Sequence, residues 1–186
     1  MAMPLAHRRF TVDEYHRMAE TGILGENDRV ELLDGEIVEM TPIGPGHAGC
    51  VDDLVRLFYR VAGEAVILGV QRPLAVGTHW EPQPDVAVLK PRPQGYRRVH
   101  PRPSDVVLLI EVADSSLEFD RAVKLPLYAR AGIAEVWLVN LRATQIEVYC
   151  APRDGAYTDR RVLGRDATLT VLGLPGITLP ARDILG

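Results

Sequence analysis

The sequence predicts an α/β fold in which a mixed central sheet is flanked by helices and preceded by an N-terminal hairpin extension. Short apolar runs at 86–89, 106–112 and 135–140 have the length and the Val, Ile and Leu content of buried strands. Two longer stretches, 47–62 and 117–131, repeat apolar residues every three or four positions, as amphipathic helices do. With 186 residues and 47% hydrophobic content, the chain suffices for one well-filled core, so we expect a single domain.

The N-terminal part contains signals for a short helix and a hairpin. Thr11 followed by Glu14 forms a capping-box pattern, which predicts a helix from there to about Glu20. An Asp-Gly pair then separates two apolar-rich runs, 29–33 and 36–40, and this pair is the usual turn of a two-residue hairpin.

The middle of the chain alternates helix, strand and loop. A helix is expected at 47–63, followed by one bent strand or two short ones at 65–70 and 72–76, and then by the strand 84–89. The segment 91–105 contains four prolines and one glycine, so we expect a loop there.

The remaining elements follow the strand at 106–112. Asp114, Ser115 and Ser116 supply cap residues for the helix 117–131, which Gly132 ends. Further strands are expected at 135–140, 145–149, 161–163 and 168–171. The expected layout is an N-terminal helix and hairpin at about 10–41, a core at about 46–150, and C-terminal strands at about 156–180.

Composition excludes several function classes. The net charge of −4 argues against a protein that coats nucleic acid by bulk positive charge, so a polyanion would have to meet a local basic patch. Cys50 and Cys150 have no partners at metal-ligand spacing and signal no disulfide framework, which favours a reducing, cytoplasmic location. No apolar run approaches 18 residues, so no membrane segment is expected.

Two carboxylates and one lysine are the main candidates for catalysis. Asp85 opens the strand 84–89 and Glu111 lies near the end of the strand 106–112, each among apolar residues. A carboxylate in such a strand is costly to bury unless a cation or hydrogen bonds compensate it. Lys124 is one of only 2 lysines, against 19 arginines, which indicates a specific need for an ammonium group at that position.

These residue types are suited to metal-assisted phosphoryl chemistry. Mg²⁺ is usually held by one or two carboxylates together with water and phosphate oxygens. On neighbouring strands Asp85 and Glu111 would face one another at roughly 5 Å. A helix that starts near Leu117 and folds back could return Lys124 to the level of Glu111, where an ammonium can orient water and stabilise negative charge.

Structural roles are the alternatives for each residue. Asp85 could cap a turn, and Glu111 could form a purely structural ion pair with Arg121 or Lys124. Lys124 could lie at the solvated edge of its helix. His47 could be a general base, but a lone histidine at a helix start more often has a capping or buried structural role.

The motifs around these residues resemble the PD-(D/E)XK nuclease superfamily, through Pro84-Asp85 followed by Ile110-Glu111-Val112-Ala113. More narrowly, the chain resembles the Uma-type bacterial family of restriction endonucleases over roughly 10–179. The motifs that carry this narrower resemblance are 31–36, His47, 83–85, 111–112, Ser115-Ser116, Asp120, Lys124, 128–132 and 135–139.

The resemblance implies a restriction-endonuclease-like core and Mg²⁺-dependent phosphodiester hydrolysis, with Mn²⁺ as a substitute ion. Asp85 and Glu111 would be metal ligands, with the Val112 carbonyl as a third. The superfamily lysine is expected two residues after the second acid, where this chain has Ala113. Lys124 would replace it from the following helix.

Glu31 resembles an acidic residue that joins the site from an upstream element in several branches of the superfamily. Whether it reaches Asp85 depends on the register of the hairpin, and it could equally pair with Arg29 or Arg72. The sequence therefore leaves its role open.

DNA is the expected partner, and a homodimer or higher oligomer is expected because one acidic subunit has a small basic footprint. The loop before the Glu111 strand could contact phosphates, or it could simply be a solvated, proline-stiffened loop. Its candidate contacts are Arg92, Arg97, Arg98 and Arg102. The alternative function is a catalytically inactive nuclease fold that acts as a nucleic-acid-binding or assembly module.

Overall fold

A six-stranded mixed sheet forms the centre of the protein, in a computed structural model that describes residues 7–186. The strand order is β3-β4-β5-β6-β7-β8, with β5 and β6 parallel and every other neighbouring pair antiparallel. The six strands are β3 Ile67–Val70, β4 Val86–Leu89, β5 Val106–Ala113, β6 Glu135–Asn140, β7 Gln145–Arg153 and β8 Ala156–Leu163. The fold class predicted from the sequence is confirmed.

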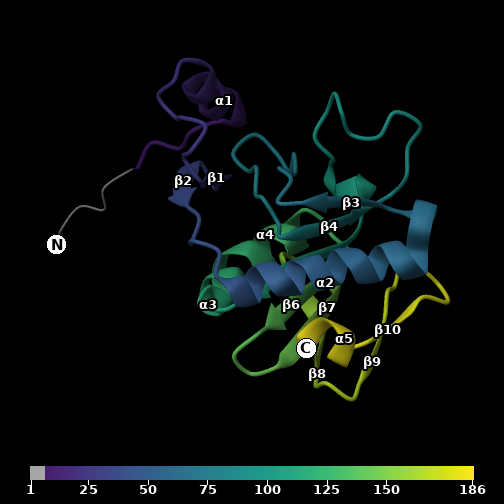
Figure 1. Cartoon of the computed structure of the whole chain (residues 1–186). Helices are drawn as coiled ribbons and strands as arrows, with labels where there is room; N and C mark the ends of the chain where they lie inside the picture. Colours follow the sequence, from purple (N-terminus) through teal and green to yellow (C-terminus); the bar gives the residue numbers. More distant parts are fainter. Residues whose placement is uncertain (1–6) are drawn as a thin grey trace.

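One face of the sheet is covered by the long helix α2 (Pro45–Ala62), which crosses the strands in Figure 1. Leu54 and Phe58 of α2 pack among the strand residues that point to this face, such as Ile110 and Trp137. The C-terminal elements extend the same core at the yellow end of the chain (Figure 1). They are β9 Thr168–Thr170, β10 Thr178–Pro180 and α5 Arg182–Leu185.

The opposite face is covered by α4 (Leu125–Arg130) and part of the N-terminal extension. Its core contains the strand residues that point to this second face, including Leu109 and Leu138, and they pack with Tyr128 of α4. Because alternate residues of a strand point to opposite faces, Glu111 shares the face of Leu109. The sheet therefore presents Glu111 toward α4.

The N-terminal extension follows the sequence prediction closely. Helix α1 (Val12–Glu20) has Thr11 as N-cap and a complete capping box with Glu14. Strands β1 (Val30–Leu33) and β2 (Glu36–Glu39) form the expected hairpin, with both residues of the Asp-Gly turn at positive φ.

The helix expected at 117–131 contains a segment of π-helix. After α3 (Leu117–Phe119), residues Asp120–Lys124 form the π segment, and the N–H of Leu125 donates to the carbonyl of Asp120, five residues back. Pro126 has no N–H to donate to the carbonyl four residues earlier, so the α-helical ladder is already interrupted here. Both Asp120 and Lys124 are buried by this arrangement.

Some expected boundaries were wrong. Residues 72–76 form no strand, because Pro73 lacks a donor and the N–H groups of Leu74 and Ala75 bond to the carbonyls of Pro82 and Pro101 instead of to a neighbouring strand. Asp85 lies in a bend just before β4, and β5 continues past Glu111 to Ala113. Strand β8 is much longer than the expected 161–163.

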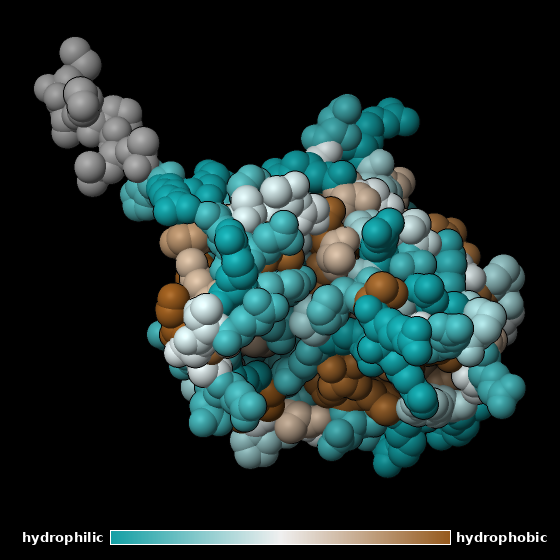
Figure 2. Space-filling view, turned by 90° about the horizontal axis from the view of Figure 1, so that it is seen from above, coloured by the Kyte–Doolittle hydropathy of each residue, from teal (hydrophilic) through white to brown (hydrophobic). Residues whose placement is uncertain are grey.

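Polar residues cover most of the surface in the view from above, and hydrophobic residues are visible in separate patches between them (Figure 2). Throughout residues 7–186, no helix combines the length and the apolar character needed to cross a membrane.

Candidate functional site

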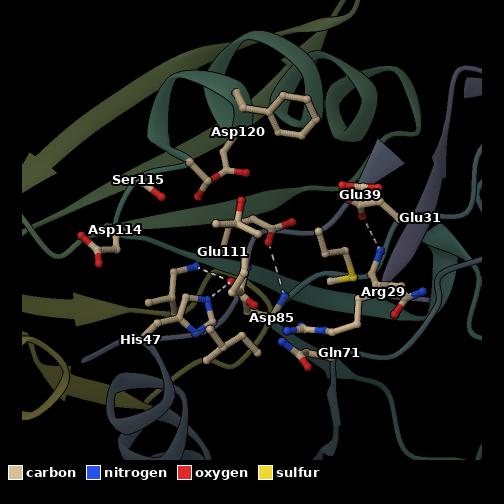
Figure 3. Close-up of a pocket in the computed structure, with 18 of the residues that line it drawn as sticks. Arg29, Glu31, Glu39, His47, Gln71, Asp85, Glu111, Asp114, Ser115 and Asp120 are labelled. Atoms are coloured by element: carbon tan, nitrogen blue, oxygen red, sulfur yellow. Dashed lines mark hydrogen bonds and ion pairs between the residues drawn. The ribbon is translucent and has the colours of Figure 1, made fainter. Parts of the chain in front are cut away.

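A cavity of about 340 Å³ opens between the hairpin, the start of α2 and the π segment, over the sheet edge where β4 begins. Figure 3 shows acidic side chains converging on this cavity from several elements. Its charged lining includes Glu31, His47, Asp85, Glu111, Asp120 and Lys124.

Asp85 and Glu111 lie opposite one another on adjacent antiparallel segments of the sheet. The register pairs Val86 with Ile110, which places Asp85 across from Glu111 on the same face. The backbone N–H of Asp85 lies 3.4 Å from Glu111 Oε2, and the N–H of Val112 donates to Asp85 Oδ2 at 2.8 Å. The two carboxylates are therefore fixed by the backbone around them.

Lys124 contacts two carboxylates from different elements. Its Nζ lies 3.2 Å from Glu31 Oε1 and 3.4 Å from Glu111 Oε1. The other oxygen of Glu31 accepts a hydrogen bond from the backbone N–H of Gln83 at 3.0 Å. Glu31 thus joins the cluster through Lys124 and the segment that leads to Asp85.

Two side chains were not assigned to the site from the sequence. Tyr128 is fully buried, as expected of a core residue, but its hydroxyl also donates to Glu111 Oε1 at 2.5 Å. His47 Nε2 lies 3.0 Å from Asp85 Oδ2, a contact visible in Figure 3, while its buried Nδ1 has no hydrogen-bond partner. The signal for Tyr128 was its position four residues after Lys124, one helical turn along the same face.

Burial dominates the electrostatics of Glu111, which is 2% exposed. Desolvation raises the pKa of Glu111 to about 8, although Lys124 opposes the change. Burial likewise raises the pKa of Asp120, whose carboxylate accepts a hydrogen bond from the Ser116 hydroxyl at 2.8 Å. Burial therefore lets both carboxyl groups keep a proton to a higher pH than a free carboxyl group does.

Lys124 is held in its charged form. Burial alone would lower the pKa of this ammonium, but the carboxylates of Glu111 and Glu31 more than offset that effect and raise it above the ordinary value. A lysine in this state donates hydrogen bonds and positive charge, and it cannot accept a proton near neutral pH.

The lining fits a divalent cation in its donor chemistry and its charge. Mg²⁺ prefers oxygen ligands, and six carboxyl groups line the cavity against the two cations Arg29 and Lys124. The six are Glu31, Glu39, Asp85, Glu111, Asp114 and Asp120. Asp85 and Glu111 supply two such groups, and Val112 lies beside them in the lining. The described residues contain one three-residue group of metal-ligand type, His16, Glu81 and His100, and it lies outside this cavity.

The arginines of the 91–105 loop do not line this cavity. Arg97 and Arg98 border a separate depression together with Arg72, and Arg92 lies over the ring of Tyr96 at 5.2 Å from its centroid. The structure therefore separates the candidate phosphate contacts from the acidic cluster.

The mixed sheet, with helices on both faces, has the restriction-endonuclease-like α/β fold. The sequence model of the Uma2 family, described as "Putative restriction endonuclease", matches residues 12–182, and the chain belongs to this family. A comparison with curated proteins gives no match.

A solved structure supports the fold class independently. The crystal structure of a "putative nuclease belonging to DUF820" from Anabaena variabilis ATCC 29413 superimposes with a TM-score of 0.72. The two proteins are 17% identical, and the similarity covers 95% of this chain and 97% of the other. At this identity the likeness concerns the fold.

Proposed function

We propose that the protein is a Mg²⁺-dependent endonuclease that hydrolyses phosphodiester bonds in DNA. The observation that carries the proposal is the contact of Lys124 with Glu31 and Glu111, next to Asp85, in one cavity where β4 begins and β5 ends. Membership of the Uma2 family and the nuclease-like fold support the same reaction class.

Asp85 and Glu111 would hold the ion, with the Val112 carbonyl as a further ligand. When bound, Mg²⁺ lowers the pKa of a coordinated water and screens the charge of the phosphate. The chain itself orients these ligands, since the Val112 N–H and His47 hold Asp85 while Tyr128 holds Glu111.

Lys124 would position the attacking water and stabilise the negative charge that develops on the phosphate. It is suited to this because its ammonium remains protonated and because two carboxylates fix its location. Glu31 acts as a positioning residue, because it contacts the lysine and the Gln83 backbone. Lys124 thus takes the role that Ala113 cannot supply from the strand.

DNA would reach the cavity from its open side, and the arginines of the separate depression would contact phosphates further along the strand. Two copies of the chain would bring two such basic surfaces together and allow paired cuts. These steps predict that cleavage falls steeply as the salt concentration rises.

The test compares plasmid and branched DNA cleavage by the wild-type protein and by Glu111→Gln, with Mg²⁺, Mn²⁺ or a chelator. We expect cleavage that requires the metal and that Glu111→Gln reduces by at least about a hundredfold. Cleavage that survives this substitution would overturn the assignment. If calorimetry shows no Mg²⁺ or Mn²⁺ binding while DNA is still retarded in a gel, the protein is a binding module.

Glu135→Gln is the matched control. Glu135 is also a buried strand carboxylate, but it accepts hydrogen bonds from Trp137 Nε1 and the Leu172 N–H, away from the cavity. We expect this variant to keep wild-type cleavage, so loss in Glu111→Gln alone identifies the cavity.

A further inference from the structure

Two histidines and a buried glutamate meet at a second place, away from the acidic cavity. His16 comes from α1, Glu81 from the segment that precedes β4, and His100 from the loop after β4. One ligand atom of each lies within 4.8 Å of the others, and His16 Nε2 is 2.8 Å from Glu81 Oε1. None of the three lines the cavity that contains Asp85.

The Glu81 side chain is buried and its backbone is fixed. The residue is 3% exposed, and its backbone N–H donates to the carbonyl of Leu32 at 2.8 Å within an isolated β-bridge. Among the described residues His16 is the only side chain in hydrogen-bond contact with this carboxylate. A carboxylate removed from water in this way favours a nearby cation.

The two histidines can adjust around it. The His16 side chain is 42% exposed, and His100 is exposed in the proline-rich loop. Donor atoms around a tetrahedral zinc ion lie roughly 3.3 Å apart, given bond lengths of about 2.0–2.1 Å. Since all three atoms are already within 4.8 Å, side-chain movements of up to about 1.5 Å, which the exposed His100 can make, would complete the arrangement.

We propose that His16, Glu81 and His100 form a binding site for a transition-metal ion, with Zn²⁺ as the best-suited ion. Two imidazoles and one carboxylate match the ligand preference of Zn²⁺, whereas Mg²⁺ prefers oxygen donors. The exposed side of the cluster gives the ion an entry path and leaves a fourth position for water or another ligand.

The ion would cross-link three segments that are far apart in sequence. It would attach α1 to the 91–105 loop and to the bridge between Leu32 and Glu81. Glu31, which contacts Lys124, is adjacent to Leu32 in β1. The ion would therefore fix the N-terminal extension, which carries Glu31, in place against the sheet.

The experiment measures Zn²⁺ binding to chelator-treated protein by calorimetry, in the Glu111→Gln background to weaken binding in the acidic cavity and with excess Mg²⁺. We expect one equivalent of Zn²⁺, and a loss of affinity of at least about a hundredfold in both His16→Ala and His100→Ala. With Zn²⁺ at 100 times its Kd, the melting temperature should rise by roughly 5–10 °C, and both variants should lose this rise.

His7→Ala is the control, because His7 is exposed and outside the cluster. It should leave the affinity and the thermal shift unchanged. The metal-free melting temperature of His100→Ala should equal that of the parent, since the side chain is exposed and its loss should not unfold the protein. Failure to bind Zn²⁺, or equal binding by the parent and both ligand variants, would overturn the proposal.

Discussion

Replacing Lys124 with methionine tests how far this one cation holds the acidic cluster together. Methionine keeps the unbranched shape of the side chain but removes the charge. Lys124 is 6% exposed, and its Nζ contacts Glu31 and Glu111 at 3.2 and 3.4 Å. The substitution therefore leaves two buried carboxylates without their shared partner.

The magnitude follows from these distances. At an effective dielectric constant of about 20, each contact contributes about 5 kcal/mol of attraction, much of which is offset by the desolvation of the charges. Removing one partner of a buried ion pair typically costs about 3–5 kcal/mol of unfolding free energy. With a urea m-value of about 2 kcal/mol/M, the unfolding midpoint should fall by about 1.5–2.5 M.

Urea unfolding in a chelator at about pH 9, where Glu111 is ionised, measures this change through the tryptophan fluorescence, to which the buried Trp137 contributes. Lys90→Met is the matched control, because Lys90 is the other lysine, is exposed, and its ammonium donates to the Ser104 carbonyl rather than to a buried carboxylate. Adding Glu111→Gln to Lys124→Met should restore part of the loss, because it removes one unpaired charge. A midpoint for Lys124→Met within about 0.5 M of the wild-type value would refute this reasoning.

Two further predictions concern titrating groups. In a chelator, the unfolding free energy should fall as the pH rises from about 4.5 to about 8, because the raised pKa of Glu111 lets the folded state hold a proton that the unfolded state has released. Glu111→Gln should flatten this part of the pH profile. An unchanged slope in this variant would contradict the assignment to Glu111. The thiol of Cys50, whose pKa burial raises to about 12 and whose Sγ donates to the Ile184 carbonyl, should react with a thiol reagent at least about a thousandfold more slowly in the native protein than in urea. Equal rates in the two states would show that this thiol is accessible.

The sequence predicts those elements that are marked by an apolar run or by a local capping pattern. The strand at 135–140 and the capping box at Thr11 agree with the structure because hydrophobic burial and capping are local signals. Strand β8 was mostly missed because its side chains are largely exposed, so no alternation marks it. The error at 72–76 arose because hydrogen bonds to distant carbonyls, which no local pattern reveals, decide that segment.

Composition and motifs identify the candidate residues, while their geometry depends on the tertiary structure. Acids within apolar runs and a rare lysine indicate Asp85, Glu111 and Lys124. The register of β4 against β5 places the two acids opposite one another, and the π segment determines where the lysine lies. The contact of Tyr128 with Glu111 depends on packing between α4 and the sheet. The sequence indicates that Tyr128 is a core residue, but it does not indicate which group its hydroxyl contacts.

The π segment acts as a one-residue insertion in an otherwise regular helix. Each residue of an α-helix turns the chain by about 100°, so the extra residue changes the phase of everything before it relative to α4. Deleting Ala122 would remove the extra residue, keep Lys124 in phase with Tyr128, and rotate Asp120 by about 100° away from the cavity. Insertion of a single residue thus offers a route by which a helix can acquire a second charged group without disturbing the first.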